Sequence, residues 1–247
     1  MISKKTTSIM GVILALTGEV LLGLGTRIRV NVADAARENN TPYRVVARLR
    51  YAMSMNNTLT FLKNFIRHPT QVGAIAPSSP GLVKTMVEWF DWESARNVVE
   101  FGPGTGVFTE GIVQRLHPDA KFFAIERSAE LVTATRKRCP SVTVYEDSVT
   151  NVVDLCRRES MPHVDAVICG LPWASFSESL QGEIMDSMLE VLRPGGQFAT
   201  FAYWQGLALP AGQRFSSRLK KTFPQVGRSS TVWRNLPPAF VYRCTRA

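Results

Sequence analysis

The segment spanning residues 98–106 constrains the fold more than any other part of the chain. Two valines precede Glu100, and glycine then occupies every second position, at 102, 104 and 106. This pattern predicts a strand that ends in a tight turn whose backbone approaches a ligand closely. A dinucleotide-binding turn places its third glycine at the position that Val107 occupies here, and a phosphate-binding loop needs a lysine that does not follow. The carboxylate of Glu100 disfavours a phosphate and suits a ligand that carries an ammonium or a sulfonium group.

Strand and helix patterns alternate through the rest of the chain. A helix is expected to begin at Ser78-Ser79-Pro80. Strands are expected at 97–101, 121–126, 142–145, 164–169 and 196–203, with helices near 107–116, 128–138, 149–158 and 177–192. Two further strands, at about 225–233 and 239–245, are expected to close the chain as an antiparallel pair. This order predicts a Rossmann-like α/β fold with a seven-stranded, mostly parallel sheet, an antiparallel C-terminal strand and an N-terminal helical extension.

The 247 residues fit one α/β domain and an extension, which we divide into three segments. Residues 1–40 form an apolar and basic segment, residues 41–94 an amphipathic helical cap, and residues 95–247 the ligand-binding domain. The four cysteines are dispersed, and the three histidines lack the spacing of metal ligands. We therefore expect no metal site and a reducing, cytosolic compartment.

Charge is concentrated at the N-terminus. Residues 1–70 contain ten Lys and Arg against three acidic residues, whereas residues 71–247 contain nineteen against seventeen. Such an asymmetry is typical of a chain that meets a polyanion, either an anionic membrane surface or a nucleic acid. A solvated tail is the alternative interpretation.

An apolar run occupies residues 9–25 and contains four glycines and Glu19. It is shorter than the ~20 residues that cross a bilayer, and a central carboxylate is costly there. We expect a membrane-associated helix, with a true span, or packing against the domain or a partner, as alternatives. Basic amphipathic patterns at 41–53 and 59–67 suit helices that lie in a membrane interface, or ordinary helices that cover the sheet.

Glu100 and the G-x-G-x-G turn resemble motif I of the class I S-adenosylmethionine (SAM) methyltransferases. This resemblance implies SAM as the methyl donor and S-adenosylhomocysteine as the product. It also implies the cofactor-binding residues, which lie after successive strands. The methionine moiety is assigned to Glu100, Gly102, Pro103, Gly104, Thr105 and Gly106, the ribose to Glu126 beside Arg127, and the adenine to Asp147 beside Ser148.

The resemblance extends to one branch of these enzymes. Residues 61–80, the Gly170-Leu171-Pro172 sequence and residues 233–243 resemble the bacterial phospholipid N-methyltransferases, which act on phosphatidylethanolamine or ornithine lipids. Coverage is roughly residues 55–247. The resemblance implies methyl transfer to the amine headgroup of a membrane aminolipid at the cytoplasmic face of the bacterial inner membrane.

The acceptor side of the site is expected around Gly170 and Leu171, whose carbonyls could accept the amine hydrogens. Trp173 could hold a methylated ammonium by a cation–π interaction, with core packing as the alternative. Tyr51 and His68 could assist from the cap, or be structural. Candidate ligands for a lipid phosphate are Arg44, Arg48 and Arg67.

Three other functions compete with this one. An RNA adenine-N6 methyltransferase shares the fold, but carries Asn, Asp or Ser at the position of Gly170 to bind the target base. A nucleic-acid partner is therefore disfavoured. A soluble small-molecule methyltransferase is the second alternative, and a SAM-binding or membrane-scaffold protein without activity is the third. No oligomeric state is predicted.

Overall fold

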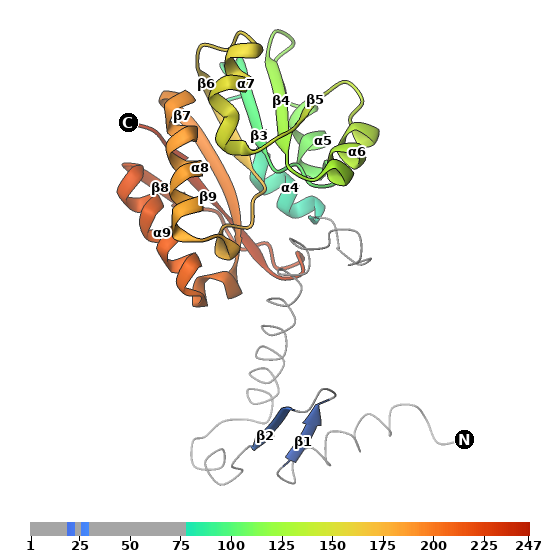
Figure 1. Cartoon of the computed structure of the whole chain (residues 1–247), viewed down its shortest axis with the longest axis vertical. Coiled ribbons are helices and arrows are strands. Elements are labelled where there is room, and N and C mark those ends of the chain that lie inside the picture. The colour runs from blue at the N-terminus through green and yellow to red at the C-terminus, as the bar shows by residue number, and fades with distance from the viewer. Residues whose placement is uncertain (1–18, 23–25, 30–77) are drawn as a thin grey trace, which may run out of the picture. The chain divides into compact units, whose positions relative to one another are not determined.

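The computed structural model describes residues 19–22, 26–29 and 78–247. The chain divides into two compact units, Met1–Asn57 and Thr58–Ala247. The first unit contains an antiparallel strand pair, β1 (Glu19–Leu22) and β2 (Thr26–Arg29), which are drawn in blue in Figure 1. The expectation of a helix over the end of the apolar run is therefore wrong at 19–22. Glycine is a poor helix former, and four glycines within residues 9–25 weaken a helix there.

The patterns expected to form helices at 41–53 and 59–67 lie outside the described residues. Among residues 19–22, 26–29 and 78–247, no helix has the length and apolarity that a membrane crossing requires.

The second unit is built on a seven-stranded sheet with the order β5-β4-β3-β6-β7-β9-β8. Its strands are β3 (Asn97–Phe101), β4 (Lys121–Glu126), β5 (Thr143–Glu146), β6 (Val164–Cys169), β7 (Leu192–Tyr203), β8 (Gln225–Arg228) and β9 (Ala239–Thr245). The strands β5, β4, β3, β6 and β7 pair in parallel, and β9 pairs antiparallel with both β7 and β8. The predicted sheet is confirmed, although β8 ends earlier than expected.

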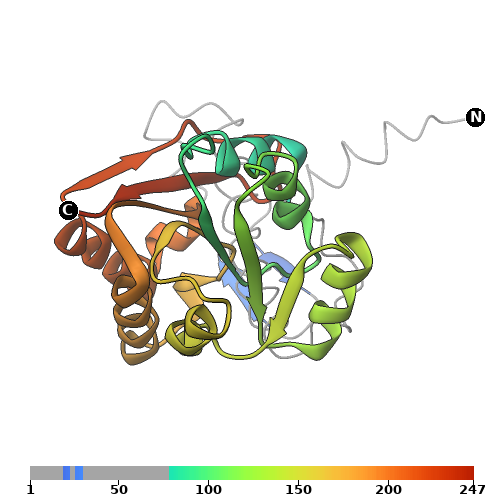
Figure 2. The same cartoon turned by 90° about the horizontal axis from the view of Figure 1, so that it is seen from above.

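Helices cover both faces of this sheet, as the view from above in Figure 2 shows. They are α4 (Pro80–Val87), α5 (Val107–Val113) and α6 (Ala129–Arg138) on one face, and α7 (Val152–Arg158), α8 (Glu178–Val191) and α9 (Pro210–Thr222) on the other. Short 3-10 turns are η1 (Val149–Asn151), η2 (Trp173–Ser175) and η3 (Trp204–Ala208). The helix predicted from Ser78-Ser79-Pro80 is confirmed, because Ser79 accepts a hydrogen bond from the Leu82 amide and Pro80 starts the helix.

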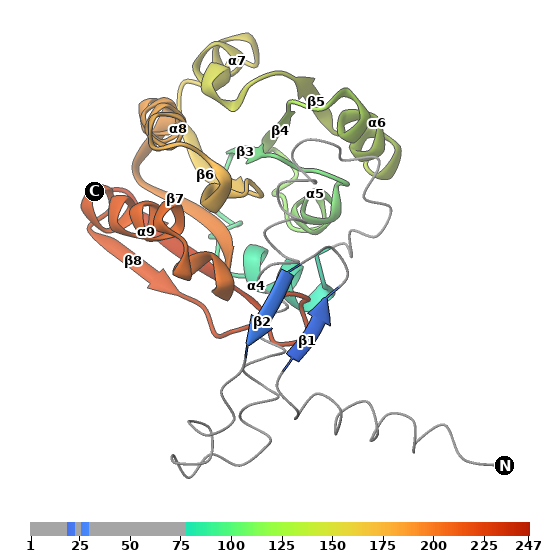
Figure 3. The same cartoon turned by 60° about the horizontal axis from the view of Figure 1, so that its bottom comes forward.

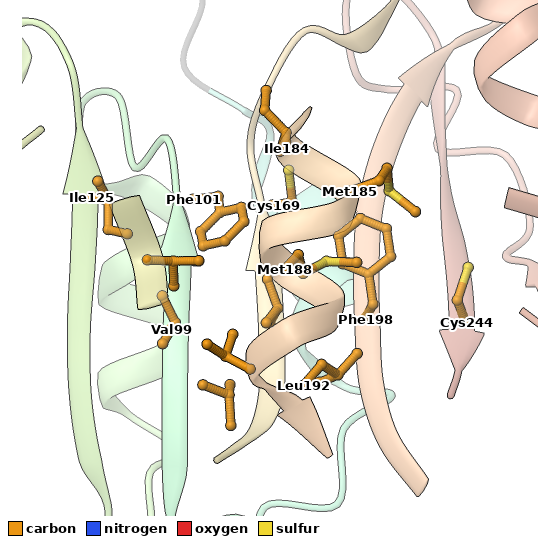
Figure 4. Close-up of a cluster of buried hydrophobic side chains, with 14 of the residues drawn as sticks. Val99, Phe101, Ile125, Cys169, Ile184, Met185, Met188, Leu192, Phe198 and Cys244 are labelled. Carbon is orange, nitrogen blue, oxygen red and sulfur yellow. The ribbon is translucent and has the colours of Figure 1, made fainter. Parts of the chain in front are cut away.

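Both faces of the sheet are apolar because both are covered. All six residues of β6 are buried, which suits a central strand of a parallel sheet. Figure 4 shows the larger cluster, in which Met185 and Met188 of α8 pack against Phe198 of β7. Burial of each such side chain stabilises the fold by roughly 1.5–3 kcal/mol.

A buried carboxylate fastens the amino ends of three strands. Asp165 of β6 accepts hydrogen bonds from the amides of Arg96 and Asn97, at 2.9 and 2.8 Å, and pairs with the Arg193 guanidinium. Burial by itself would raise the pKa of Asp165, but these donors outweigh burial and hold the pKa below its ordinary value. Asp165 thus joins the starts of β3, β6 and β7 at the edge of the sheet remote from the glycine turn.

We predict that Asp165→Asn lowers the free energy of unfolding by about 1–3 kcal/mol at neutral pH, because Arg193 loses its charged partner. A carboxyl group with a lowered pKa stabilises the fold above its ordinary pKa, and that contribution is lost as the pH falls through the folded-state pKa. The difference between variant and wild type should therefore shrink below about pH 4. Urea unfolding measures both effects.

Asp154→Asn is the matched control. Asp154 forms an exposed i,i+3 ion pair with Arg157 at 2.7 Å, and such pairs contribute about 0–1 kcal/mol. An equal loss of stability in both variants would contradict the fastening role of Asp165.

Candidate functional site

The glycine turn joins β3 to α5 at the point where strand order reverses. Neighbours β4 and β5 extend the sheet to one side of β3, and β6 and β7 extend it to the other. Gly102, Gly104 and Gly106 all have positive φ, at 66°, 62° and 78°, which confirms why glycine recurs there. A β-carbon at Gly104 would meet no described atom within 4 Å. The turn therefore presents bare backbone to open space at the ligand-binding edge of an open α/β sheet.

Glu100 lies beneath this turn and is fully buried. Its Oε2 accepts a hydrogen bond from Thr109 Oγ1 at 2.6 Å, while Oε1 has no hydrogen-bond partner among the described residues. Burial raises the pKa of Glu100 to about 8, with Thr109 opposing the shift and the Glu126 charge adding to it. A buried carboxyl group with an unused acceptor atom suits a cationic ligand.

Glu126 ends β4 next to the turn. Its Oε2 accepts from the Gly104 amide at 3.2 Å, and its Oε1 accepts from the Ser128 amide at 3.0 Å. Burial raises the pKa of Glu126, and the backbone donors oppose that rise. The neighbouring Arg127 is exposed. The two amides fix the carboxylate of Glu126 in place beside the backbone of Gly104.

The next strand end brings Asp147 and Ser148 to the same edge. The Asp147 amide donates to the Glu126 carbonyl at 3.1 Å, so the two strand ends are adjacent. Asp147 Oδ1 accepts from the Ser148 amide and from Asn151 Nδ2, both at 2.7 Å. Ser148 caps η1. Asp147 therefore stabilises the turn after β5 through its own side chain.

Sequence reasoning missed two threonines that support the turn from helices. Thr109 of α5 donates to Glu100, and Thr135 of α6 donates from Oγ1 to the Gly104 carbonyl at 2.9 Å. Both side chains are fully buried. The available signal was a hydroxyl on the apolar face of each predicted helix, where a buried polar group needs a nearby partner.

Gly170 presses directly against the glycine turn. Its amide donates to the Phe101 carbonyl at 2.7 Å, and a β-carbon at Gly170 would lie 2.4 Å from the Gly102 carbonyl oxygen. The Leu171 side chain fills the space that a β-carbon at Gly102 would need. The Leu171 carbonyl accepts from the Trp173 amide at 3.0 Å. The ends of β3 and β6 are thus packed backbone to backbone, with no room for a side chain at 170.

The geometry does not support the expected cation–π role of Trp173. Its indole is 3% exposed, stacks on Phe215 with ring centroids 4.2 Å apart, and donates from Nε1 to Thr200 Oγ1 at 3.0 Å. No exposed ring face is left for a methylated ammonium, and core packing is the interpretation that fits. Tyr51 and His68, like the three candidate phosphate ligands, lie outside the described residues.

Comparisons with known proteins identify the family. A model of a methyltransferase domain matches residues 98–196. The chain is 33% identical over 193 residues to an ornithine lipid N-methyltransferase of Singulisphaera acidiphila, covering 77% of this chain and 96% of that protein. The chain belongs to the class I SAM-dependent methyltransferases. A ribosomal RNA small subunit methyltransferase A of Acidobacterium capsulatum is also 33% identical, but over 117 residues that span 40% of its length.

Solved structures share the fold of this methyltransferase. An O-methyltransferase from Bacillus cereus, crystallised with S-adenosylhomocysteine, has a TM-score of 0.56 at 13% identity and covers 78% of this chain and 91% of its own. A SAM-dependent O-methyltransferase from Thermotoga maritima has a TM-score of 0.52 at 15% identity, covering 75% and 71%. These likenesses concern the fold.

Membership of this family implies that SAM is the cofactor, and the hydrogen-bond acceptors of this site fit SAM. SAM carries an ammonium and two ribose hydroxyls, and the site offers the unused Oε1 of Glu100 and the fixed carboxylate of Glu126. The open side of Gly104 allows a ligand to approach the backbone. The acceptor atoms therefore match the charges and donors of the methyl donor.

We predict a pH signature for Glu100. Because its folded-state pKa lies near 8 and its ordinary value is 4.5, the ligand-free folded protein keeps a proton that the unfolded chain releases. The free energy of unfolding should therefore fall between about pH 4.5 and 8, by at most about 1.4 kcal/mol per pH unit. Glu100→Gln should flatten this fall and weaken SAM binding. Unfolding curves at several pH values and calorimetric titration measure the two effects.

Glu130→Gln, an exposed change on α6, is the control and should keep the wild-type pH profile. A Glu100→Gln profile parallel to that of the wild type would refute the buried, protonated carboxyl group.

A second prediction concerns the contact between Gly170 and the turn. Gly170→Ala places a β-carbon 2.4 Å from the Gly102 carbonyl, so the turn must move. We expect S-adenosylhomocysteine affinity to drop at least about tenfold and the melting temperature to fall, since a shift of ~1 Å misplaces the binding groups. In the control Gly227→Ala, the nearest atom is 3.7 Å from the new β-carbon. Unchanged affinity and melting temperature in Gly170→Ala would show that the contact is unimportant.

Proposed function

We propose that this methyltransferase transfers methyl groups from SAM to the amine headgroup of a membrane aminolipid. The candidate acceptors are phosphatidylethanolamine with its methylated derivatives, and ornithine lipid. The observation that carries the proposal is the 33% identity that extends over 96% of an ornithine lipid N-methyltransferase. Because the match covers nearly the full length of that enzyme, it includes the region proposed to bind the acceptor as well as the glycine turn.

The cofactor side follows from the strand ends. In this proposal Glu100 accepts the ammonium of the methionine moiety, and residues 102–106 contact that moiety through their backbone. Glu126 accepts the ribose hydroxyls in a bidentate way, and Asp147 with Ser148 lies beside the adenine. When bound, SAM would supply a methyl group on its sulfonium sulfur. The amine nitrogen would bond to this carbon in line as the carbon–sulfur bond breaks, S-adenosylhomocysteine would leave, and the methylated amine would release a proton.

The acceptor side follows from the end of β6. The carbonyls of Gly170 and Leu171 accept hydrogens of the lipid amine and aim its lone pair at the methyl group. Holding the two reactants in this geometry provides much of the acceleration, so the chemistry does not demand a strong general base. Tyr51 and His68 are proposed to assist from the 41–94 cap.

The proposed membrane association is based on the positive charge of the N-terminal segment. Residues 1–70 carry ten Lys and Arg against three acidic residues, which favours an anionic leaflet at the cytoplasmic face of the inner membrane. In this proposal residues 1–40 associate with that leaflet, and residues 95–247 form the SAM-binding domain.

RNA adenine methylation is the second candidate, because an rRNA methyltransferase is 33% identical over 117 residues. The contact at Gly170 argues against it. The Asn, Asp or Ser that binds the target base in such enzymes has no space at position 170, where the Gly102 carbonyl lies 2.4 Å from a β-carbon. A lipid amine that is held by backbone carbonyls needs no side chain there.

The test is a methylation assay with the full chain. Purified protein is incubated with labelled SAM and with liposomes that contain phosphatidylethanolamine or ornithine lipid, and in parallel with bacterial ribosomal RNA. We expect label in one or both lipids and none in RNA. Glu126→Ala should reduce labelling at least about tenfold through loss of the ribose acceptor. Label in RNA and in neither lipid would overturn the proposal.

A further inference from the structure

The C-terminal quarter of the chain has no acidic side chains. Residues 191–247 contain no Asp or Glu, whereas residues 71–190 contain seventeen acidic residues against ten basic ones. The nine basic residues of the segment are Arg193, Arg214, Arg218, Lys220, Lys221, Arg228, Arg234, Arg243 and Arg246. This segment forms β7, α9, β8 and β9, coloured orange to red in Figure 1. This segment therefore carries only basic charges, although Arg193, Arg214 and Arg243 form ion pairs with acidic residues outside it.

The loop of residues 229–238 connects β8 to β9 at the functional edge of the sheet. Ala239, the first residue of β9, pairs with Tyr203, the last residue of β7. Because β7 runs parallel to β3 and β6, its end lies at the same edge as the glycine turn and Gly170. Figure 3 shows the loop in red beside α4. The 229–238 loop thus lies at the edge where methyl transfer occurs.

This loop exposes the two most solvent-accessible large apolar side chains of the described residues. Trp233 is 73% exposed and Leu236 is 77% exposed. Trp204, which is 41% exposed, borders the loop and donates from Nε1 to Thr231 Oγ1 at 3.0 Å. Clustered exposure of this kind marks a surface that contacts something apolar.

Hydrogen bonds hold the loop in shape. Asn235 is 3% exposed, and its Oδ1 accepts from the Ser79 amide at 3.0 Å while its Nδ2 donates to the Pro237 carbonyl at 2.7 Å. The Val232 amide donates to the Ala239 carbonyl at 2.8 Å. These hydrogen bonds turn the Asn235 side chain toward the protein interior, and the nearby side chains of Trp233 and Leu236 remain exposed to solvent. The exposure of the two apolar side chains is therefore a built feature of the loop.

The chemistry of the loop selects a lipid bilayer as its partner. Arg234 is exposed between Trp233 and Leu236 and forms no ion pair with a described residue. Tryptophan favours the membrane–water interface, a basic side chain is attracted to anionic lipid headgroups, and an aliphatic side chain gains free energy when it is buried among acyl chains. A nucleic acid would attract the arginine but would offer nothing to Leu236.

We propose that the 229–238 loop docks on an anionic phospholipid bilayer. Trp233 and Leu236 enter the boundary between headgroups and acyl chains, and Arg234 binds a lipid phosphate. Docking through this loop sets the ends of β3, β6 and β7 against the membrane surface, where a lipid amine reaches Gly170 without leaving the bilayer. This inference rests on the proposed function, since it names the surface on which the acceptor is presented.

The test uses the full chain and vesicles of phosphatidylcholine and phosphatidylglycerol. With acyl chains that are brominated near the headgroup, the fluorescence of the wild type should be quenched, and Trp233→Phe should remove most of this quenching. The double variant Trp233→Ser, Leu236→Ser should partition at least about tenfold more weakly. Arg234→Gln should weaken partitioning about fivefold at low salt and much less at high salt.

Val113→Ser is the matched control, because Val113 is 37% exposed at the far end of α5. It should bind vesicles and S-adenosylhomocysteine as the wild type does, and the double variant should keep its S-adenosylhomocysteine affinity. Wild-type partitioning of the double variant, with no quenching of Trp233, would overturn the proposal. Tighter binding to RNA than to vesicles, lost in the double variant, would also overturn it.

The two proposals can fail separately. If the wild type methylates an aminolipid and Trp233 is not quenched, the docking proposal fails and the enzymatic one stands. If Trp233 is quenched and no aminolipid is methylated, the function fails and docking stands.

Discussion

The close approach of two backbones at the centre of the sheet is the constraint on which the site depends. The Gly170 amide donates to the Phe101 carbonyl at 2.7 Å, and the Gly102 carbonyl occupies the space of any side chain at 170. This contact joins the glycine turn after β3 to the loop after β6, which are the proposed cofactor and acceptor sides of the site. In the proposed function, this one packing restriction brings the donor and acceptor sides together and leaves no space at position 170 for the side chain that a base-recognising enzyme uses.

The buried carboxyl group of Glu100 is the second determinant. Burial raises its pKa to about 8, and Thr109 satisfies only one of its oxygens. A group in this state is costly to the ligand-free fold and is stabilised when a cation arrives. The unpaired oxygen of Glu100 therefore favours a positively charged ligand. The amides of Gly104 and Ser128 hold the carboxylate of Glu126 nearby, as a second hydrogen-bond acceptor.

Particular residues show how far sequence patterns reach. The strands from β3 to β7 and the helix cap at Ser79 were predictable, since periodicity and capping are local signals. The sequence leaves the role of Trp173 open, because a tryptophan after a strand is equally compatible with a ligand contact and with the core. Only its packing on Phe215 decides for the core. The basic flank of residues 191–247 was visible as a charge pattern, but its significance appears only beside the exposed Trp233 and Leu236.

The sequence by itself determined the positions of the strands and helices, the glycine turn and the resemblance to the family, because all three depend on short-range spacing along the chain. The tertiary structure alone decided which groups meet: Thr135 with the Gly104 carbonyl, Gly170 with the turn, and the 229–238 loop with the edge that holds the site. These partners are separated by about 30 to more than 100 residues. Contacts at such separations arise from the order in which strands join the sheet, and local propensity carries no record of that order.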